Sequence, residues 1–171
     1  MNAESAGSNA WLRTIAIGRN PRNTLLRIFV LVLVCFVTFR FVLLPIHVEG
    51  GSMLPTYRDH RVNFVNMLAY RYSEPKRGDV VTIKLAGPSV MFMKRIVGLP
   101  GETIAFHHGH AIINGEPLDE PYVKNPCDWE IPPRTLGADE YYFVGDNRSM
   151  PEYDHTKGVA PRARIAGKVL L

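Results

Sequence analysis

The 171-residue sequence contains few cysteines, and outside one apolar segment it contains no stretch with helical periodicity. Its two cysteines, Cys35 and Cys127, are too few for a disulfide scaffold or a multi-cysteine zinc site. The length excludes a full dinucleotide-binding enzyme, a (β/α)8 barrel and a multi-span transporter. Glycine and proline are plentiful, with 14 and 13 residues, which is typical of strands joined by turns and not of a helical bundle.

An excess of positive charge is absent from the larger part of the chain, although the whole chain has a formal net charge of +4. Five arginines precede Pro45 against a single acid, Glu4, which leaves 15 basic and 15 acidic residues from Pro45 onward. A nucleic-acid-binding domain concentrates positive charge on its folded part. We therefore expect no nucleic acid among the partners.

The one long apolar run follows the arginine-rich N-terminus and covers residues 28–46, with Arg40 as the single charge inside it. A helix over this run would be roughly 28 Å long at about 1.5 Å per residue, which is close to the thickness of a bilayer core. The run predicts a single-pass transmembrane signal-anchor in the cell (inner) membrane, with the lipid bilayer as a partner. The arginines predict that residues 1–27 are cytoplasmic, so residues 47–171 would form an extracytoplasmic domain.

Two other interpretations of this run remain open. A cleavable secretory signal has the same order of basic and apolar segments, but His47-Val48-Glu49 is a poor match to the small-x-small pattern of a cleavage site. A buried core helix would show an amphipathic pattern, and none is visible in the run.

Short apolar runs separated by turn signals follow the apolar run and predict a mostly β domain. Strands are expected at residues 62–67, 79–85, 90–97, 103–106, 111–113, 141–144 and 165–170. Asn114-Gly115 predicts a type I′ hairpin turn. Residues 125–137 are rich in proline and predict an irregular surface segment.

A serine preceded by two glycines comes shortly after the apolar run. Gly50 and Gly51 allow unusual dihedral angles and a close approach of substrate to the backbone at Ser52. The backbone amide of Ser52 is then free to act as an oxyanion donor. Taken alone, this segment is better explained as an ordinary glycine-serine turn.

A lysine within a predicted strand makes the catalytic interpretation stronger. Alternation places Lys94 on the same strand face as Val90, Phe92 and Ile96. Burial on that face would lower the pKa of the lysine and make it a base near neutral pH. Arg95 points to the other face and cannot serve, because a guanidinium does not lose its proton.

Four ordered segments resemble the four boxes of the type I signal peptidases. They are residues 52–56 (SMLPT), 77–81 (RGDVV), 94–102 (KRIVGLPGE) and 145–148 (GDNR). The resemblance covers residues 49 to about 158. It implies a signal-peptidase-like β-barrel or sheet domain, and a membrane-bound serine endopeptidase that removes signal peptides from exported pre-proteins with a Ser/Lys dyad and no cofactor.

The resemblance assigns roles to four residues near the predicted cleft. Ser52 corresponds to the nucleophile and Lys94 to the general base, while the Ser52 N–H corresponds to an oxyanion donor. Gly50 stands where some members add a hydroxyl group, so the oxyanion hole would rely on backbone donors here. Met53 corresponds to a residue beside the substrate cleft.

The last box carries further supporting roles in the family. By resemblance, Gly145 passes close to the lysine, and Asp146 pairs with the arginine directly after that lysine, here Arg95.

The sequence departs from the family after this box. Pro151 stands where a serine that supports the lysine is expected, and His155 stands where an arginine is expected. Either a shift brings Ser149 and Asp154 into the supporting roles, or the lysine is oriented differently.

The histidines present two further alternatives. The sequence His107-His108-x-His110 invites a metal interpretation, but no acidic residue lies at ligand spacing, so we expect a solvated turn and no metal. His155 as the base for Ser52 is a second arrangement that the sequence leaves open.

Other functions remain possible beside a general signal peptidase. A specialised maturase, such as a conjugative-transfer peptidase or an organellar inner-membrane protease, would use the same chemistry. A self-cleaving repressor shares the dyad but carries a helix-turn-helix where this chain has an apolar run. A catalytically inactive membrane-anchored β-domain could serve as an assembly subunit, although intact Ser52 and Lys94 argue against it. The sequence does not indicate an oligomeric state.

Overall fold

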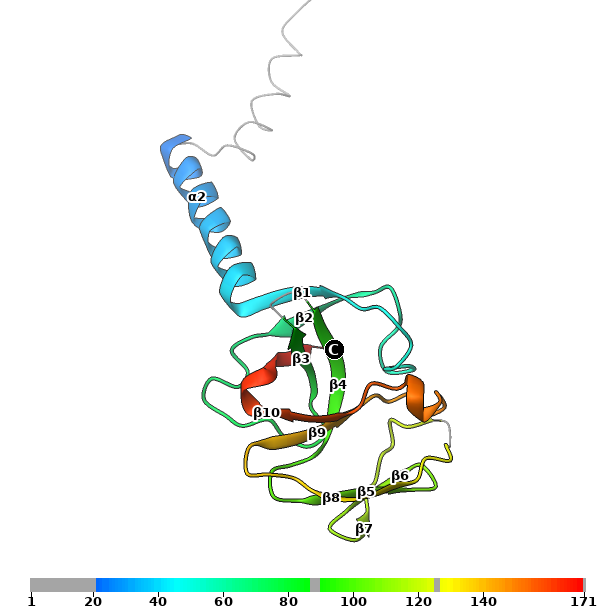
Figure 1. The fold of residues 1–171 in the computed structure, drawn as a ribbon. Helices are drawn as coiled ribbons and strands as arrows, with labels where there is room; N and C mark the ends of the chain where they lie inside the picture. Colours follow the sequence, from blue (N-terminus) through cyan, green and yellow to red (C-terminus); the bar gives the residue numbers. More distant parts are fainter. Residues whose placement is uncertain (1–20, 87–89, 125–126, 171) are drawn as a thin grey trace, which may run out of the picture. The chain divides into compact units, whose positions relative to one another are not determined.

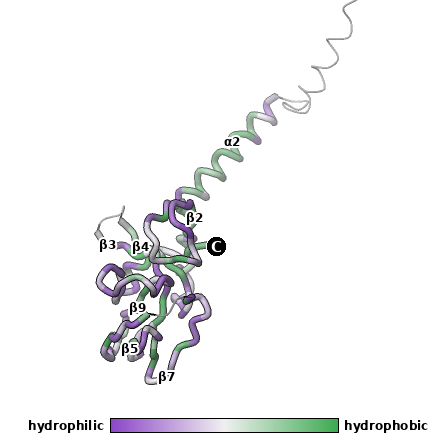
Figure 2. Tube along the Cα trace, turned by 90° about the vertical axis from the view of Figure 1, so that its right-hand side faces the viewer, coloured by the Kyte–Doolittle hydropathy of each residue, from purple (hydrophilic) through white to green (hydrophobic). Residues whose placement is uncertain are grey.

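A computed structural model of the protein describes residues 21–86, 90–124 and 127–170, in a helical unit that ends at Arg40 and a β unit that begins at Phe41 (Figure 1). In the helical unit, α2 (Pro21–Val37) continues into a π-helical turn, η1 (Thr38–Val42). No residue of α2 is buried within the protein, and Figure 2 shows α2 as hydrophobic along most of its length. The helix Pro21–Val42 is long and apolar enough to cross a membrane, which suggests a membrane anchor.

The helix differs from the predicted span 28–46 at both ends. It begins at Pro21, and residues 43–46 belong to strand β1 (Leu43–His47) in the β unit. β1 pairs with β2 (Val62–Asn66) at the edge of a sheet, where Pro45 can lack an N–H without breaking an inner ladder. The helical prediction for residues 43–46 was wrong because a short apolar run has the same composition in a spanning helix and in a strand. Residues 1–20 of the predicted cytoplasmic segment lie outside the described residues.

The β unit consists of two antiparallel sheets, which confirms the predicted mostly β fold (Figure 1). The larger has the order β1-β2-β11-β3-β4-β9-β10 and the smaller has the order β7-β6-β5-β8. The further strands of the larger sheet are β3 (Val80–Ala86), β4 (Val90–Gly98), β9 (Glu140–Val144), β10 (Gly158–Pro161) and β11 (Ile165–Leu170). Those of the smaller are β5 (Thr103–His107), β6 (His110–Ile113), β7 (Glu116–Pro117) and β8 (Ile131–Thr135). Two 3-10 turns, η2 (Glu152–Asp154) and η3 (Arg162–Arg164), precede β10 and β11.

All seven predicted strands are present, as β2, β3, β4, β5, β6, β9 and β11. The predicted hairpin is also confirmed, because Asn114 and Gly115 have φ values of 53° and 90° and Ile113 pairs with Glu116. The irregular segment predicted at 125–137 is wrong in part, since Ile131–Thr135 forms β8. β8 is an edge strand beside β5, which tolerates its two prolines. Residues 125–126 lie outside the described residues.

Separate apolar clusters hold the segments that carry the candidate site. Met53 packs with Tyr57, Val65 and Val80 in one cluster, which fixes the turn that follows β1. A second cluster contains Trp129 and extends between the two sheets; its other buried members are Val97, Ile104, Phe106, Ala111, Ile113, Leu136, Tyr142 and Val144. The first cluster anchors the segment around Ser52, and the second supports the end of β9.

Candidate active site

Ser52 and Lys94 lie together, as predicted, although 42 residues separate them in the sequence. Ser52 is in the turn after β1 and Lys94 is in the middle of β4. The Nζ atom of Lys94 donates a hydrogen bond to Oγ of Ser52. A serine hydroxyl in contact with an amine is the arrangement needed for the amine to take the hydroxyl proton.

The environment of Lys94 increases the fraction of its neutral form. Lys94 is only 3% exposed, its strand register sets it opposite Val81, and its Nζ lies 5.8 Å from the ring centre of Phe92. Burial lowers the pKa of Lys94 to about 8, although the nearby charge of Asp146 acts in the opposite direction. The predicted burial of the lysine is confirmed, while the Val90 side chain lies outside the described residues.

The last box contacts the backbone of the serine turn. The Asn147 N–H donates to the carbonyl oxygen of Ser52 at 3.0 Å, and Nδ2 of Asn147 donates to the carbonyl oxygen of Gly51 at 2.9 Å. Gly145 approaches so closely that a Cβ atom there would lie 2.2 Å from the Ser52 oxygen. Only glycine permits this approach. The contacts of Gly145 are with Ser52 and His155, and its predicted closeness to Lys94 stays a prediction.

A buried ion pair joins the last box to β4. Arg95 donates from Nε and Nη2 to the two carboxylate oxygens of Asp146, at 2.8 and 2.6 Å, and Asp146 is 1% exposed. This is the pairing that the resemblance implied, in the two-pronged geometry that favours arginine. Oγ1 of Thr56 also donates to Asp146, at 2.6 Å. The carboxylate therefore links the serine turn to the residue next to Lys94.

Sequence reasoning missed a second polar network below this pair. The guanidinium of Arg95 lies 3.9 Å from the ring centre of Tyr122, whose hydroxyl donates to Glu120 at 2.9 Å. Glu120 in turn pairs with Arg148, which is 1% exposed. No local pattern predicts this network, because its members come from β4, from the segment after β7 and from the last box. It compensates the charge of the buried Arg148.

The structure contradicts the supporting roles that were predicted for Ser149 and Asp154. Ser149 is exposed and donates its hydroxyl proton to Asn147 at 2.6 Å, and Asp154 is exposed at the end of η2. Among the described residues, neither forms a hydrogen bond to Lys94. The reason is the turn after Pro151, which leaves Asp154 exposed in the wall of the cleft and returns the chain to the interior at His155.

A cleft of about 600 Å³ opens beside the dyad. Residues 44–48 line one side and residues 91–94 another, and the predicted cleft residues Gly50, Ser52 and Met53 are all in its wall. Gly50 has a φ of 94°, and its N–H donates to Asp59 at 2.8 Å. Because β1 is the end strand of its sheet, an extended peptide can reach the dyad along an unpaired strand edge.

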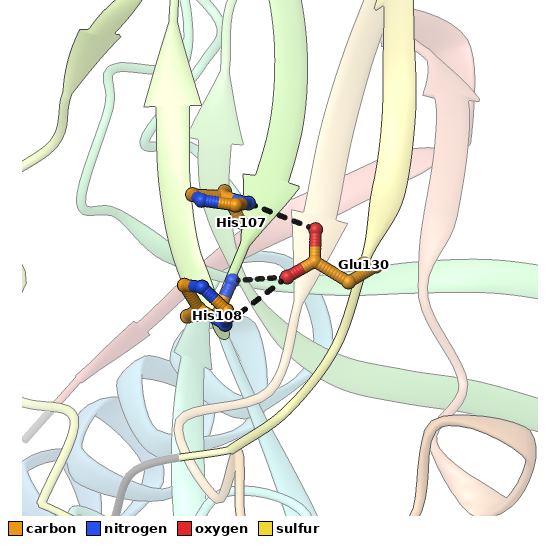
Figure 3. Close-up of side chains that lie close together, drawn as sticks. All are labelled: His107, His108 and Glu130. Atoms are coloured by element: carbon orange, nitrogen blue, oxygen red, sulfur yellow. Dashed lines mark hydrogen bonds and ion pairs between the residues drawn. The ribbon is translucent and has the colours of Figure 1, made fainter.

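A surface cluster of His107, His108 and Glu130 lies on the smaller sheet (Figure 3). The Glu130 carboxylate accepts from the His108 N–H at 2.7 Å and lies 3.0 and 3.3 Å from Nδ1 of His107 and His108. The expectation that no acidic residue joins these histidines was wrong, because pairing of β8 with β5 brings Glu130 from 22 residues away. Their donors suit zinc, but the ion pairs and the hairpin turn explain the arrangement without a metal.

A buried lysine bonded to a serine beside a peptide-sized cleft defines the class of serine peptidases that use lysine in place of histidine. Residues 22–171 match the model of one family within it, described as "Signal peptidase, peptidase S26", and the chain belongs to that family.

Similar proteins include bacterial signal peptidases. The chain is 35% identical over 133 residues to signal peptidase I of Leptolyngbya laminosa, covering 73% of this chain and 66% of that protein. It is 30% identical over 131 residues to the probable signal peptidase I-2 of Synechocystis sp., covering 73% and 60%. It is 35% identical over 151 residues to signal peptidase I T of Bacillus subtilis, covering 82% and 78%. The chain thus spans slightly less than two thirds of the first two relatives.

Proposed function

We propose that the protein is a membrane-bound serine endopeptidase that cleaves N-terminal signal peptides from exported pre-proteins. The observation that carries this proposal is the hydrogen bond between Ser52 and the buried Lys94 in the wall of the cleft. Membership of the signal peptidase family supports the choice of substrate.

The proposed reaction needs only the two side chains of the dyad and a water molecule. Neutral Lys94 takes the hydroxyl proton of Ser52 as Oγ attacks the carbonyl carbon of the scissile peptide. The Lys94 ammonium then gives that proton to the leaving amine as the C–N bond breaks, which leaves an ester on Ser52. Lys94 next takes a proton from water as the water oxygen attacks the ester carbon. The Lys94 ammonium returns that proton to Oγ of Ser52 as the ester C–O bond breaks, which releases the signal peptide and restores the dyad.

The developing oxyanion would be stabilised by the backbone N–H of Ser52. Among the described residues, that N–H donates no backbone hydrogen bond, so it is available. Gly50 has no side chain to add a second donor, and this chain would depend on backbone donors for its oxyanion hole.

Substrate would bind in an extended conformation along the edge of β1. The carbonyl and N–H groups of the edge strand would bind the peptide backbone, and the apolar walls of the cleft would accept its side chains. Met53 and Met93 are among the residues that line the cleft. We infer a preference for small residues before the scissile bond, in the pattern Ala-x-Ala.

The helix Pro21–Val42 would anchor the enzyme as a single-pass protein in the cell (inner) membrane, with the arginine-rich N-terminus in the cytoplasm. A protease added to intact spheroplasts should then degrade the β unit and spare an N-terminal epitope tag. Protection of the β unit with loss of the tag would reverse the orientation.

A specialised maturase is the second candidate function. The departures at Pro151 and His155 favour it, since they alter the segment that returns to the dyad. It would share the dyad chemistry and differ in its range of substrates.

The decisive experiment uses the full chain in detergent and a pre-protein with an Ala-x-Ala site. We expect cleavage after the second alanine, and no cleavage by the S52A variant. The matched control is S73A, because Ser73 is exposed and its hydroxyl donates to the backbone oxygen of Ala69 at 2.7 Å. Cleavage by S52A at the wild-type rate would refute the proposed nucleophile.

A further inference from the structure

His155 differs from the other histidines of the chain. It is 4% exposed, whereas His47, His60, His107, His108 and His110 are exposed. It comes directly after η2, at the position where the resemblance leads one to expect an arginine. A buried imidazole in place of a guanidinium needs its own explanation.

The ring of His155 is held as a neutral acceptor. Its Nε2 atom accepts the backbone N–H of Gly145 at 2.8 Å, and its ring packs edge-on against Trp129 with the centres 4.8 Å apart. Burial, together with the charges of Lys94, Arg148 and Lys157, lowers the pKa of His155 to about 3. Nε2 therefore remains unprotonated at neutral and alkaline pH. Because this nitrogen is occupied by Gly145, it is not directed at the Ser52 hydroxyl.

Gly145 is fixed from both sides and in turn lies against the nucleophile. Its N–H is bound by His155 and its carbonyl oxygen accepts from Nε of Arg148 at 3.0 Å. Its Cα lies against the carbonyl oxygen of Ser52, and Asn147, two residues on, donates to the same oxygen. A short series of contacts thus leads from His155 through Gly145 to the backbone of Ser52.

We propose, on the basis of the proposed function, that His155 is a positioning residue, which binds the Gly145 N–H and thereby holds residues 145–147 against Ser52 and closes the protein around Lys94. In this chain a neutral acceptor takes the place of the arginine. Arginine has no acceptor atom and would place a permanent positive charge near Lys94. The histidine and the arginine consequently cannot make the same contact.

The test compares H155L, H155Q and H155R in the full-length enzyme in detergent, with H110L as the control for an exposed histidine. Glutamine carries an acceptor at a similar reach, whereas leucine fills the space without one. We expect H155L and H155R to lower kcat about 100-fold with little change in KM. A loss of this size is typical when a catalytic group is displaced by about 1 Å. H155Q should recover most of the activity.

The pH profile distinguishes positioning from a structural role. Loosening of residues 145–147 should admit water to Lys94, so the rise of kcat with pH should move to higher pH in H155L. The charge of Asp146, which raises the pKa of Lys94, is unchanged in all variants.

Three results would overturn the inference. The first is that H155L keeps the wild-type kcat and the wild-type pH profile. The second is that H155L has a lower Tm but an unchanged kcat per folded molecule. The third is that H155Q and H155L lose the same amount of activity and the pH profile of kcat does not shift. The S52A variant separates this inference from the proposed function. If S52A is inactive while H155L is fully active, only the role of His155 fails, and if S52A is active, the proposed function fails.

Discussion

Replacing Lys94 with arginine is expected to abolish cleavage as completely as replacing Ser52 with alanine. Arginine preserves the positive charge and nearly the length of lysine, but its guanidinium keeps its proton in proteins. The hydroxyl of Ser52 would then have no base. Single-turnover cleavage of an Ala-x-Ala peptide measures the effect, and K84R is the matched control because Lys84 is exposed on the neighbouring strand β3.

The wild-type enzyme should show the titration of Lys94 in its pH profile. Because the pKa of Lys94 is lowered to about 8, activity should rise with pH through that value as the ammonium loses its proton. At pH 8 about half of the molecules carry the free amine, compared with under about 1% for a lysine of ordinary pKa near 10.4. Below pH 7, each further unit should reduce the rate about tenfold.

One pattern of results would transfer the role of base to a histidine. If K94R kept its activity while both H155L and H155Q lost theirs, His155 would be the base and the Ser/Lys assignment would be wrong. The geometry favours the lysine, since Nζ of Lys94 contacts Oγ of Ser52 while Nε2 of His155 binds Gly145.

The sequence could predict the parts of the site that lie in local patterns. Alternation in residues 90–97 was enough to predict the burial of Lys94. The resemblance to the four boxes predicted the contact of Ser52 with Lys94 and the pairing of Asp146 with Arg95. The Asn114-Gly115 hairpin followed from turn chemistry alone. Each of these features is encoded by a few neighbouring residues or by a motif.

The remaining features depend on contacts between distant segments. Most of strand β1 was predicted as part of the membrane helix because both segments are apolar. The pairing of β1 with β2, a distant contact, is what makes this segment a strand. Glu130 reaches the histidines only through pairing of β8 with β5. His155 could not be placed because its partner is a backbone N–H, which every residue except proline carries.

Substituting Gly145 with alanine is expected to cost more activity than any other change outside the dyad. The new Cβ would lie 2.2 Å from the carbonyl oxygen of Ser52 and 2.7 Å from Nε2 of His155. The serine oxygen belongs to the backbone and cannot rotate away, so the serine turn or residues 145–147 must move, and the contact between Ser52 and Lys94 is disturbed. A displacement of about 1 Å should reduce kcat about 100-fold or more.

Two further glycine substitutions separate this effect from a general loss of packing. In G137A the nearest atoms are 3.5 Å away on the Glu140 side chain, so activity and Tm should be unchanged. In G98A the new Cβ would lie 2.8 Å from Leu136 and 2.9 Å from Tyr142 in the core between the sheets. That overpacking should cost about 1–3 kcal/mol of stability while kcat per folded molecule is kept. Wild-type kcat in G145A would instead mean that the close approach of residues 145–147 does not position the nucleophile.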